Sequence, residues 1–194
     1  MILRGCLIGA LGVLVGLAAV ADAADIGARH LATGKVEQRI RQVVAHTSGV
    51  HGRVRSFPFL AAAVNGHVTD VGATIDQLPP YSHVAVELHG TRLSVGTMVT
   101  ALRVDVTRVA HGAASFRLTE AALEREAPGA AQGAHVAVDG LHHALVITPS
   151  TGHVVVVALP PASIVPCLPA VTTSPDGYTF ACSFGTVPTA FRTP

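Results

Sequence analysis

Apolar and polar residues first alternate with a helical period along the chain. Charged residues occupy the faces between the apolar positions, and Glu37 and Arg41 stand four residues apart, where opposite charges can pair on a helix. This pattern predicts an amphipathic helix over residues 24–44. Its apolar face would carry Val36, Ile40, Val43 and Val44.

After residue 49 the period changes to two, which indicates β-strands. The first predicted strand slips out of alternation near Asp70 and Val71, which predicts a β-bulge there. The last long one, His153 to Leu159, is apolar on both faces, so we expect core on one side and a helix, a second sheet or a ligand on the other. The strands are expected at residues 66–76, 82–93, 103–109, 134–138, 141–148 and 153–159.

Three further patterns complete the predicted fold. Thr119 as an N-cap and Glu120 in the first turn predict a short helix that ends before Pro128. A hairpin is expected around residues 174–177, and the last eight residues are expected to fray. The fold class is therefore α+β, with a long, curved, mainly antiparallel sheet wrapped around one or two helices.

The first 24 residues have the pattern of an export signal. Arg4 precedes an apolar run from Cys6 to Ala21, and Asp22 and Asp25 follow it. Such an order is typical of a secretory signal and places the rest of the chain outside the cytoplasm, in the cell envelope or the periplasmic space. The segment is either cleaved or stays as an anchor in the cytoplasmic membrane. We expect a signal peptide or anchor at 1–24, one domain at 25–185 and a C-terminal tail at 186–194.

Composition narrows the classes of function. Hydrophobic residues make up 49% of the chain and charged residues 13%, and tryptophan is absent. These values exclude intrinsic disorder and favour a large apolar interior. The net charge of +1, without a run of Lys or Arg, gives no electrostatic footprint for nucleic acid.

Two cysteines flank the predicted C-terminal hairpin. In an oxidising compartment Cys167 and Cys182 are expected to form a disulfide. Closing a loop of about 15 residues would stabilise the fold by roughly 3 kcal/mol. Two buried free thiols are the alternative.

The polar residues do not form a known catalytic or metal-binding motif. The eleven histidines stand mostly alone, and His142 and His143 would point to opposite faces of a strand. The nearest approach to a serine hydrolase elbow has Arg92 in place of its first glycine. We therefore expect no cofactor, no metal and no catalysis. A subsidiary hypothesis is that histidine protonation at mild acidity strengthens contact with anionic membranes.

Phe57 and Phe59 flank Pro58. Proline fixes its own φ angle and keeps the preceding residue extended, so we expect a rigid, apolar corner in the chain here. In a structural interpretation, one ring plugs the sheet and the other begins a helical turn. In a functional interpretation, the corner closes the end of an apolar cleft, and Leu60 and Val64 face an acyl chain.

Several short motifs resemble the LmeA-like phospholipid-binding family of bacterial envelope proteins. The resemblance implies a TULIP-like half-barrel that binds phospholipid outside the cytoplasmic membrane, and, from the namesake of the family, a role in lipomannan maturation. The motifs are VEQRI at 36–40, FPFL at 57–60, GHVTDV at 66–71 and LHG at 88–90.

The leading hypothesis is non-catalytic phospholipid binding or transfer at the outer face of the cytoplasmic membrane. Its expected partners are a phospholipid, with anionic lipid as a candidate, and the membrane surface. The alternative is a structural or protein-interaction domain of the envelope with a filled core. The expected lipid contacts are Phe57, Phe59, Leu60, Val64, Val84, Val86, Val104, Val106 and Val136.

Overall fold

The structure is a computed structural model that describes residues 2–44, 46–56, 58–93, 106–130, 133–150 and 153–192. Its helical segments are α1 (Ile2–Val43), α2 (Phe59–Val64), α4 (Glu120–Glu126) and the 3-10 helix η2 (Thr189–Phe191). Its strands are β1 (Ser48–Arg55), β2 (His67–Leu78), β3 (Tyr81–Leu93), β4 (Val106–Arg108), β5 (His111–Thr119), β6 (His135–Asp139), β7 (Ala144–Thr148), β8 (Val155–Ala158), β9 (Ala170–Ser174) and β10 (Gly177–Phe184).

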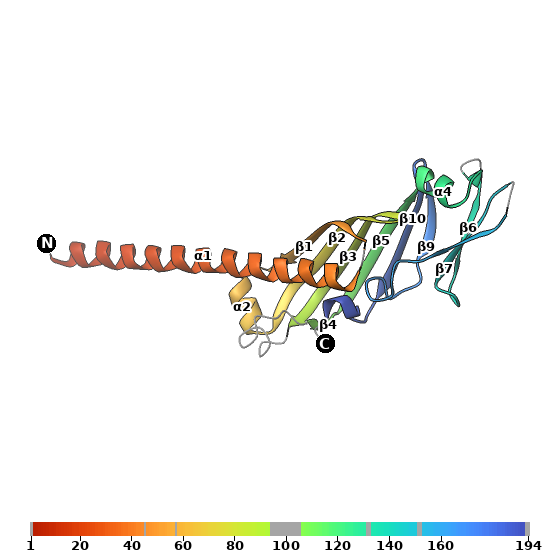
Figure 1. The fold of residues 1–194 in the computed structure, drawn as a ribbon. Coiled ribbons are helices and arrows are strands. Elements are labelled where there is room, and N and C mark those ends of the chain that lie inside the picture. The colour runs from red at the N-terminus through yellow and green to blue at the C-terminus, as the bar shows by residue number, and fades with distance from the viewer. Residues whose placement is uncertain are drawn as a thin grey trace.

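The strands form two antiparallel sheets. The larger one has the order β1-β2-β3-β5-β10-β9, with β4 added to the end of β3, and the smaller one has the order β6-β7-β8. The larger sheet is not closed, because β1 and β9 remain as its edges, and α1 crosses one of its faces (Figure 1). The predicted α+β class with a large antiparallel sheet is confirmed.

Helix α1 continues without a break from Ile2 to Val43, and its N-terminal half projects beyond the sheet (Figure 1). The predicted apolar face is confirmed, since Val36, Ile40 and Val44 are buried. None of the described helices has an apolar stretch that qualifies as a candidate membrane span.

The expected pairing of Glu37 with Arg41 is wrong, because both side chains bond to β1 instead. The backbone amide of Gly52 donates to Glu37 Oε1 at 2.9 Å, and Arg41 Nη2 donates to the carbonyl oxygen of Val50 at 3.4 Å. A Cβ on Gly52 would lie 2.8 Å from the carbonyl oxygen of Thr33, so only a glycine lets α1 approach β1 this closely. Side chains of α1 that bond to the backbone of β1, together with the close approach at Gly52, therefore fix the helix to the sheet edge.

We call the side of the large sheet that faces α1 the core face. Gly52 points toward α1 and pairs with Ala73, which pairs in turn with Val86 and then Ala114. Residues directly opposite each other share a face, so this row lies on the core face across four strands. Aromatic rings extend the packing, because Phe116 stacks on Phe180 with centroids 4.8 Å apart.

Tyr81 joins the two sheets. Its ring packs edge-on against Phe116, with centroids 5.0 Å apart, and its hydroxyl donates to the carbonyl oxygen of Ala158 in β8 at 2.6 Å. Burial, and secondarily the charge of Glu126, raises the pKa of Tyr81 well above its usual range. The phenol therefore stays protonated and keeps the small sheet attached to the large one.

Two predictions about strands need correction. The alternation in β2 does slip, because Val68 and Val71 are both buried, but pairing with β1 and β3 runs on without a shift, so the predicted bulge is absent. Val68 lies at the end of β2 that contacts α2. In β8, Val157 is buried but Val156 is 64% exposed, so the described residues do not supply the expected second cover.

The chain end also differs from the prediction. Val187, Ala190 and Phe191 are buried, and the amide of Ala190 donates to the carbonyl oxygen of Ser163 at 2.9 Å. Helix η2 contacts α1. The expected fraying is therefore wrong as far as residue 192, because apolar side chains of the tail complete the core.

Candidate functional site

The predicted lipid contacts fall into two groups in the structure. Leu60 and Val64 of α2 are 38% and 68% exposed, respectively. Protein atoms cover the other described members, which belong to the hydrophobic core and are at most 8% exposed. These covered residues are Phe59, Val84, Val86, Val106 and Val136. Phe57 and Val104 lie outside the described residues.

The strand valines come from different parts of the fold. Val84 and Val86 lie on the core face of β3, where Val84 stands opposite Ile75 and Val86 opposite Ala73. Val136 lies in the small sheet, where it pairs with Ile147. An acyl chain could touch these valines only if the elements that now cover them moved apart.

The apolar corner after β1 is held by α1. Phe59 begins α2 and is fully buried, and Pro58 at the N-cap offers no side-chain acceptor. Asp25 of α1 supplies one instead, because its Oδ1 accepts a hydrogen bond from the amide of Leu60 at 2.7 Å. No pattern in the sequence indicates this contact, since the two residues are far apart along the chain.

Asp25 is buried and its charge is compensated. The amide of Leu60 is the main cause that lowers the pKa of Asp25, with further contributions from the amide of Phe59 and from Arg29. Arg29 Nη2 lies 3.4 Å from Asp25 Oδ2 and also donates to the carbonyl oxygen of Ser56 at 3.1 Å. This network attaches both the end of β1 and the start of α2 to α1.

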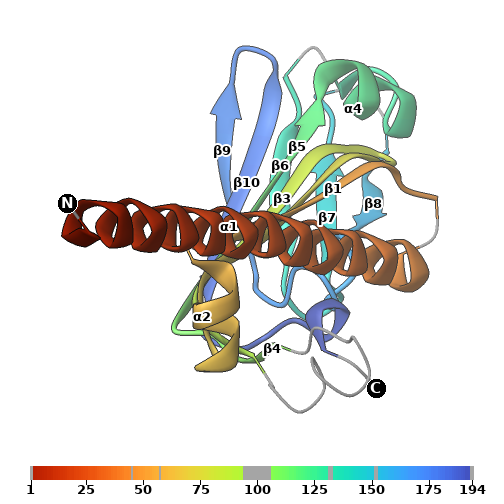
Figure 2. The same cartoon turned by 90° about the vertical axis from the view of Figure 1, so that its left-hand side faces the viewer.

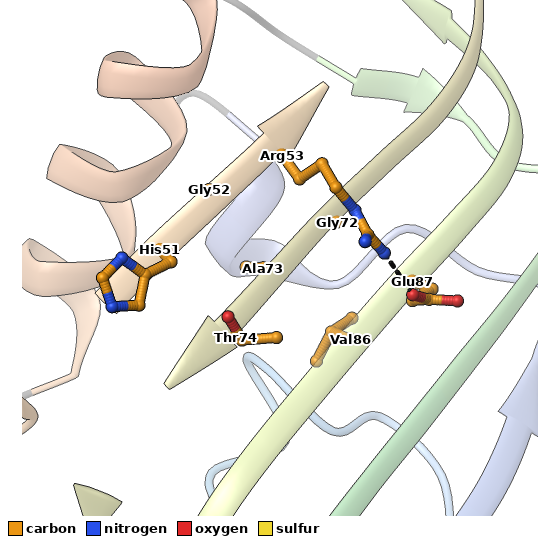
Figure 3. A pocket seen from close by; sticks show the side chains of 8 residues that line it. All are labelled: His51, Gly52, Arg53, Gly72, Ala73, Thr74, Val86 and Glu87. Atoms are coloured by element: carbon orange, nitrogen blue, oxygen red, sulfur yellow. Dashed lines mark hydrogen bonds and ion pairs between the residues drawn. The ribbon is translucent and has the colours of Figure 1, made fainter. Parts of the chain in front are cut away.

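The opposite face of the large sheet is polar near β1. A hollow of about 190 Å³ lies there. Arg53 and Glu87, which both line it, form an ion pair with each other (Figure 3). Small-molecule pockets usually have volumes of about 300–1,000 Å³, so the hollow is too small for a phospholipid. Its lining residues are His51, Gly52, Arg53, Gly72, Ala73, Thr74, Val86 and Glu87.

The histidines join separate local networks. His89 Nδ1 lies 2.6 Å from Asp70 Oδ1, and His143 Nε2 lies 3.0 Å from the carbonyl oxygen of Pro160. The prediction that placed His142 in a strand is wrong, because β7 begins at Ala144. In the described part of the chain, no group of three or more His, Cys, Asp or Glu residues could hold a metal ion.

The predicted disulfide is present. Cys167 and Cys182 are bonded, with their Cα atoms 6.0 Å apart. Cys182 lies on β10. This strand forms the expected hairpin with β9, in which Gly177 pairs with Ser174. The bond attaches the segment before β9 to the large sheet, and it is consistent with an exported protein.

Comparison with protein families decides the classification. The sequence model of the LmeA-like phospholipid-binding family matches residues 23–167. The chain belongs to this family. The match begins in α1 just before Asp25 and ends at Cys167, so it covers both sheets except for β9 and β10.

Membership in the LmeA-like family confirms the resemblance carried by the short motifs. It indicates lipid binding. Neither the curated proteins nor the solved structures gave a significant match.

Proposed function

We propose that this protein is a non-catalytic phospholipid-binding domain that acts at the outer face of the cytoplasmic membrane. Membership in the LmeA-like phospholipid-binding family is the observation that carries the proposal. The apolar run at residues 6–21 and the disulfide between Cys167 and Cys182 support a location outside the cytoplasm. Transfer of the lipid between membranes, in support of lipomannan-type glycolipid maturation, is the cellular role that we infer.

The proposed binding region lies between α1 and the core face. Each methylene of an acyl chain gains about 0.8 kcal/mol on leaving water, so a carrier needs an apolar lining that competes with the bilayer. Val84 and Val86 supply branched, apolar side chains on the core face, Val106 supplies one from β4, and Val136 supplies one from the small sheet. The rings of Phe57 and Phe59 and the side chain of Val104 complete the proposed set.

Entry of a lipid requires α1 or α2 to move. The covered valines are at most 8% exposed. Within the described residues, hydrogen bonds from Gly52 to Glu37 and from Arg41 to Val50 join α1 to β1. Arg29 joins α1 to Ser56 at the end of β1, and Asp25 joins α1 to α2. Opening would break few polar contacts, and the lipid tail would replace the lost apolar contacts.

A pair of substitutions on one strand tests this proposal. Val84 faces the core, and Ala85 faces the opposite side of the same strand and is half-buried. Val84→Phe should reduce uptake and transfer of a fluorescent phospholipid between vesicles, because the ring occupies the space of the tail. Ala85→Phe should leave both unchanged. Equal transfer by the two variants, with both folded by circular dichroism, would count against the site.

A second candidate is a structural or protein-interaction domain of the envelope. It is favoured by the burial of the core-face valines and by the stacked rings of Phe116 and Phe180, which fill interior volume with the chain's own atoms. This candidate predicts that neither Val84→Phe nor Ala85→Phe changes lipid uptake or transfer, because no lipid enters the domain. The transfer experiment therefore separates the two functions.

A further inference from the structure

One end of the large sheet carries a row of basic side chains. In the strand register, His67 of β2 stands opposite Arg92 of β3, and Arg92 stands opposite Arg108 of β4. All three residues are exposed. The Cβ atoms of directly opposed residues are about 4.5–5.5 Å apart, so both guanidinium groups share one small area.

This arrangement costs stability unless an anion compensates it. Like charges directly opposite each other destabilise an antiparallel pair. Within the described residues, no carboxylate forms an ion pair with Arg92 or Arg108. Elsewhere on the same sheet, Arg53 is neutralised by Glu87. The opposed arginines are therefore suited to an anion from outside the chain.

Helix α2, beside this row, exposes apolar side chains. Phe59 and Ala63 are buried, whereas Leu60 and Val64, one turn apart on the other face, are 38% and 68% exposed. Val64 precedes His67 by three residues, which limits their Cα separation to about 11 Å. Helix α2 and strand β4 also lie at the same end of the large sheet in both views (Figures 1 and 2).

Helix α1 leaves the sheet at this same end. Asp25 caps α2, and the helix continues from there away from the sheet (Figure 1). The apolar run at residues 6–21 belongs to this projecting part. A bilayer that received this part of α1 would next meet α2 and the basic row.

We propose that His67, Arg92 and Arg108, together with Leu60 and Val64, form a surface that docks on an anionic phospholipid bilayer. Arginine forks bind phosphate oxygens in pairs, and the exposed apolar side chains enter the boundary between headgroups and acyl chains. The inference extends the proposed function and rests on it for the assumption that the domain works at a membrane. It assigns an orientation, with α2 and β4 toward the lipid and α4 away from it (Figure 2).

A tryptophan reporter tests this orientation in the full chain, which contains no tryptophan of its own. Val64→Trp is compared with Val156→Trp on β8, since the two valines have similar exposed fractions of 68% and 64%. With vesicles of phosphatidylcholine and phosphatidylglycerol that carry brominated acyl chains, Val64→Trp should be quenched and blue-shifted. Val156→Trp should remain in water.

The role of the arginines is tested in the Val64→Trp background. Arg92→Gln with Arg108→Gln should reduce quenching to the level seen with pure phosphatidylcholine vesicles. Arg117→Gln with Arg125→Gln removes the same charge from exposed positions near α4 and should leave the quenching unchanged. Equal loss in both double variants, or no loss in either, would overturn the anion-binding role.

The outcome is separable from the proposed function. If the protein carries phospholipid but the Val64→Trp reporter stays in water, the docking surface is wrong and phospholipid binding stands. If the reporter is quenched while the protein neither holds nor transfers lipid, the docking surface stands and the proposed function is wrong.

Discussion

Asp25 of α1 accepts a hydrogen bond from the backbone amide of Leu60 at 2.7 Å and thereby caps α2, the helix that follows β1 in the chain. Short helices leave their first amides without partners, and Pro58 cannot supply one from its side chain. The contact explains how a six-residue helix keeps a fixed position on the domain. It also gives α1 a structural role beyond its apolar face.

Removing the Asp25 carboxylate should release α2. Asp25→Ala leaves the amide of Leu60 without its acceptor and Arg29 without its ion-pair partner. For Asp25→Ala we expect a lower Tm and faster hydrogen exchange in α2. Asp25→Asn keeps an acceptor oxygen, so its Tm and its exchange rate should lie between those of Asp25→Ala and the wild type. Unchanged exchange in α2 for Asp25→Ala would refute the capping role.

The stability that the Asp25 carboxylate contributes should depend on pH. Hydrogen bonding lowers the pKa of Asp25 below 3.8 in the folded protein. A lowered pKa contributes stability that is present above the unfolded value and is lost as pH falls through the folded value. The Tm difference between wild type and Asp25→Asn should therefore shrink as pH drops from neutral to below 3.8. A constant difference in calorimetry would contradict this assignment.

Gly52 should be intolerant of a side chain. Its Cβ would lie 2.8 Å from the carbonyl oxygen of Thr33, so Gly52→Ala must push α1 away, at a cost of about 1–3 kcal/mol. Gly34→Ala is the matched control, since nothing lies within 4 Å of its Cβ, and it should stabilise α1 by about 0.8–1 kcal/mol. Urea unfolding measures both, and equal effects would show that the close approach is unimportant.

The stacked rings of the core should dominate stability. Phe116 is 1% exposed and contacts both Tyr81 and Phe180, so Phe116→Ala should cost about 3–5 kcal/mol. Val156→Ala, on the exposed face of β8, should change the unfolding free energy by no more than about 0.5 kcal/mol. A small effect of Phe116→Ala would indicate a loosely filled interior at this point.

The disulfide should stabilise the domain mainly through the unfolded state. Replacing Cys167 and Cys182 together by serine opens a loop with a sequence separation of 15 residues, which should cost roughly 3 kcal/mol. Urea unfolding of the double variant should match that of reduced wild type. A reductant that leaves the wild-type midpoint unchanged would mean that the bond contributes nothing.

The sequence predicted the elements better than their contacts. The helical period identified the buried face of α1 because Val36 and Ile40 repeat at its spacing, and a capping hydroxyl located α4, where Thr119 accepts from the amide of Ala122 at 3.2 Å. Both signals are local. The pairing of Glu37 with Arg41 failed because β1 offers backbone partners that only the folded chain brings close.

The candidate site shows the same limit. Alternation placed Val84 and Val86 on one face of a strand, but it could not show that protein atoms cover that face. The cap from Asp25 and the opposition of Arg92 to Arg108 depend on tertiary packing and strand register. No spacing in the sequence reveals either contact, which is why these residues were missed.

The lipid content of the protein tests the central claim most directly. Full-length protein is purified without detergent and analysed by native mass spectrometry and organic extraction, before and after incubation with phospholipid vesicles. We predict a folded protein that carries phospholipid at a fixed stoichiometry and takes it up from vesicles when stripped. A folded protein that contains no phospholipid and takes none from vesicles would contradict the account.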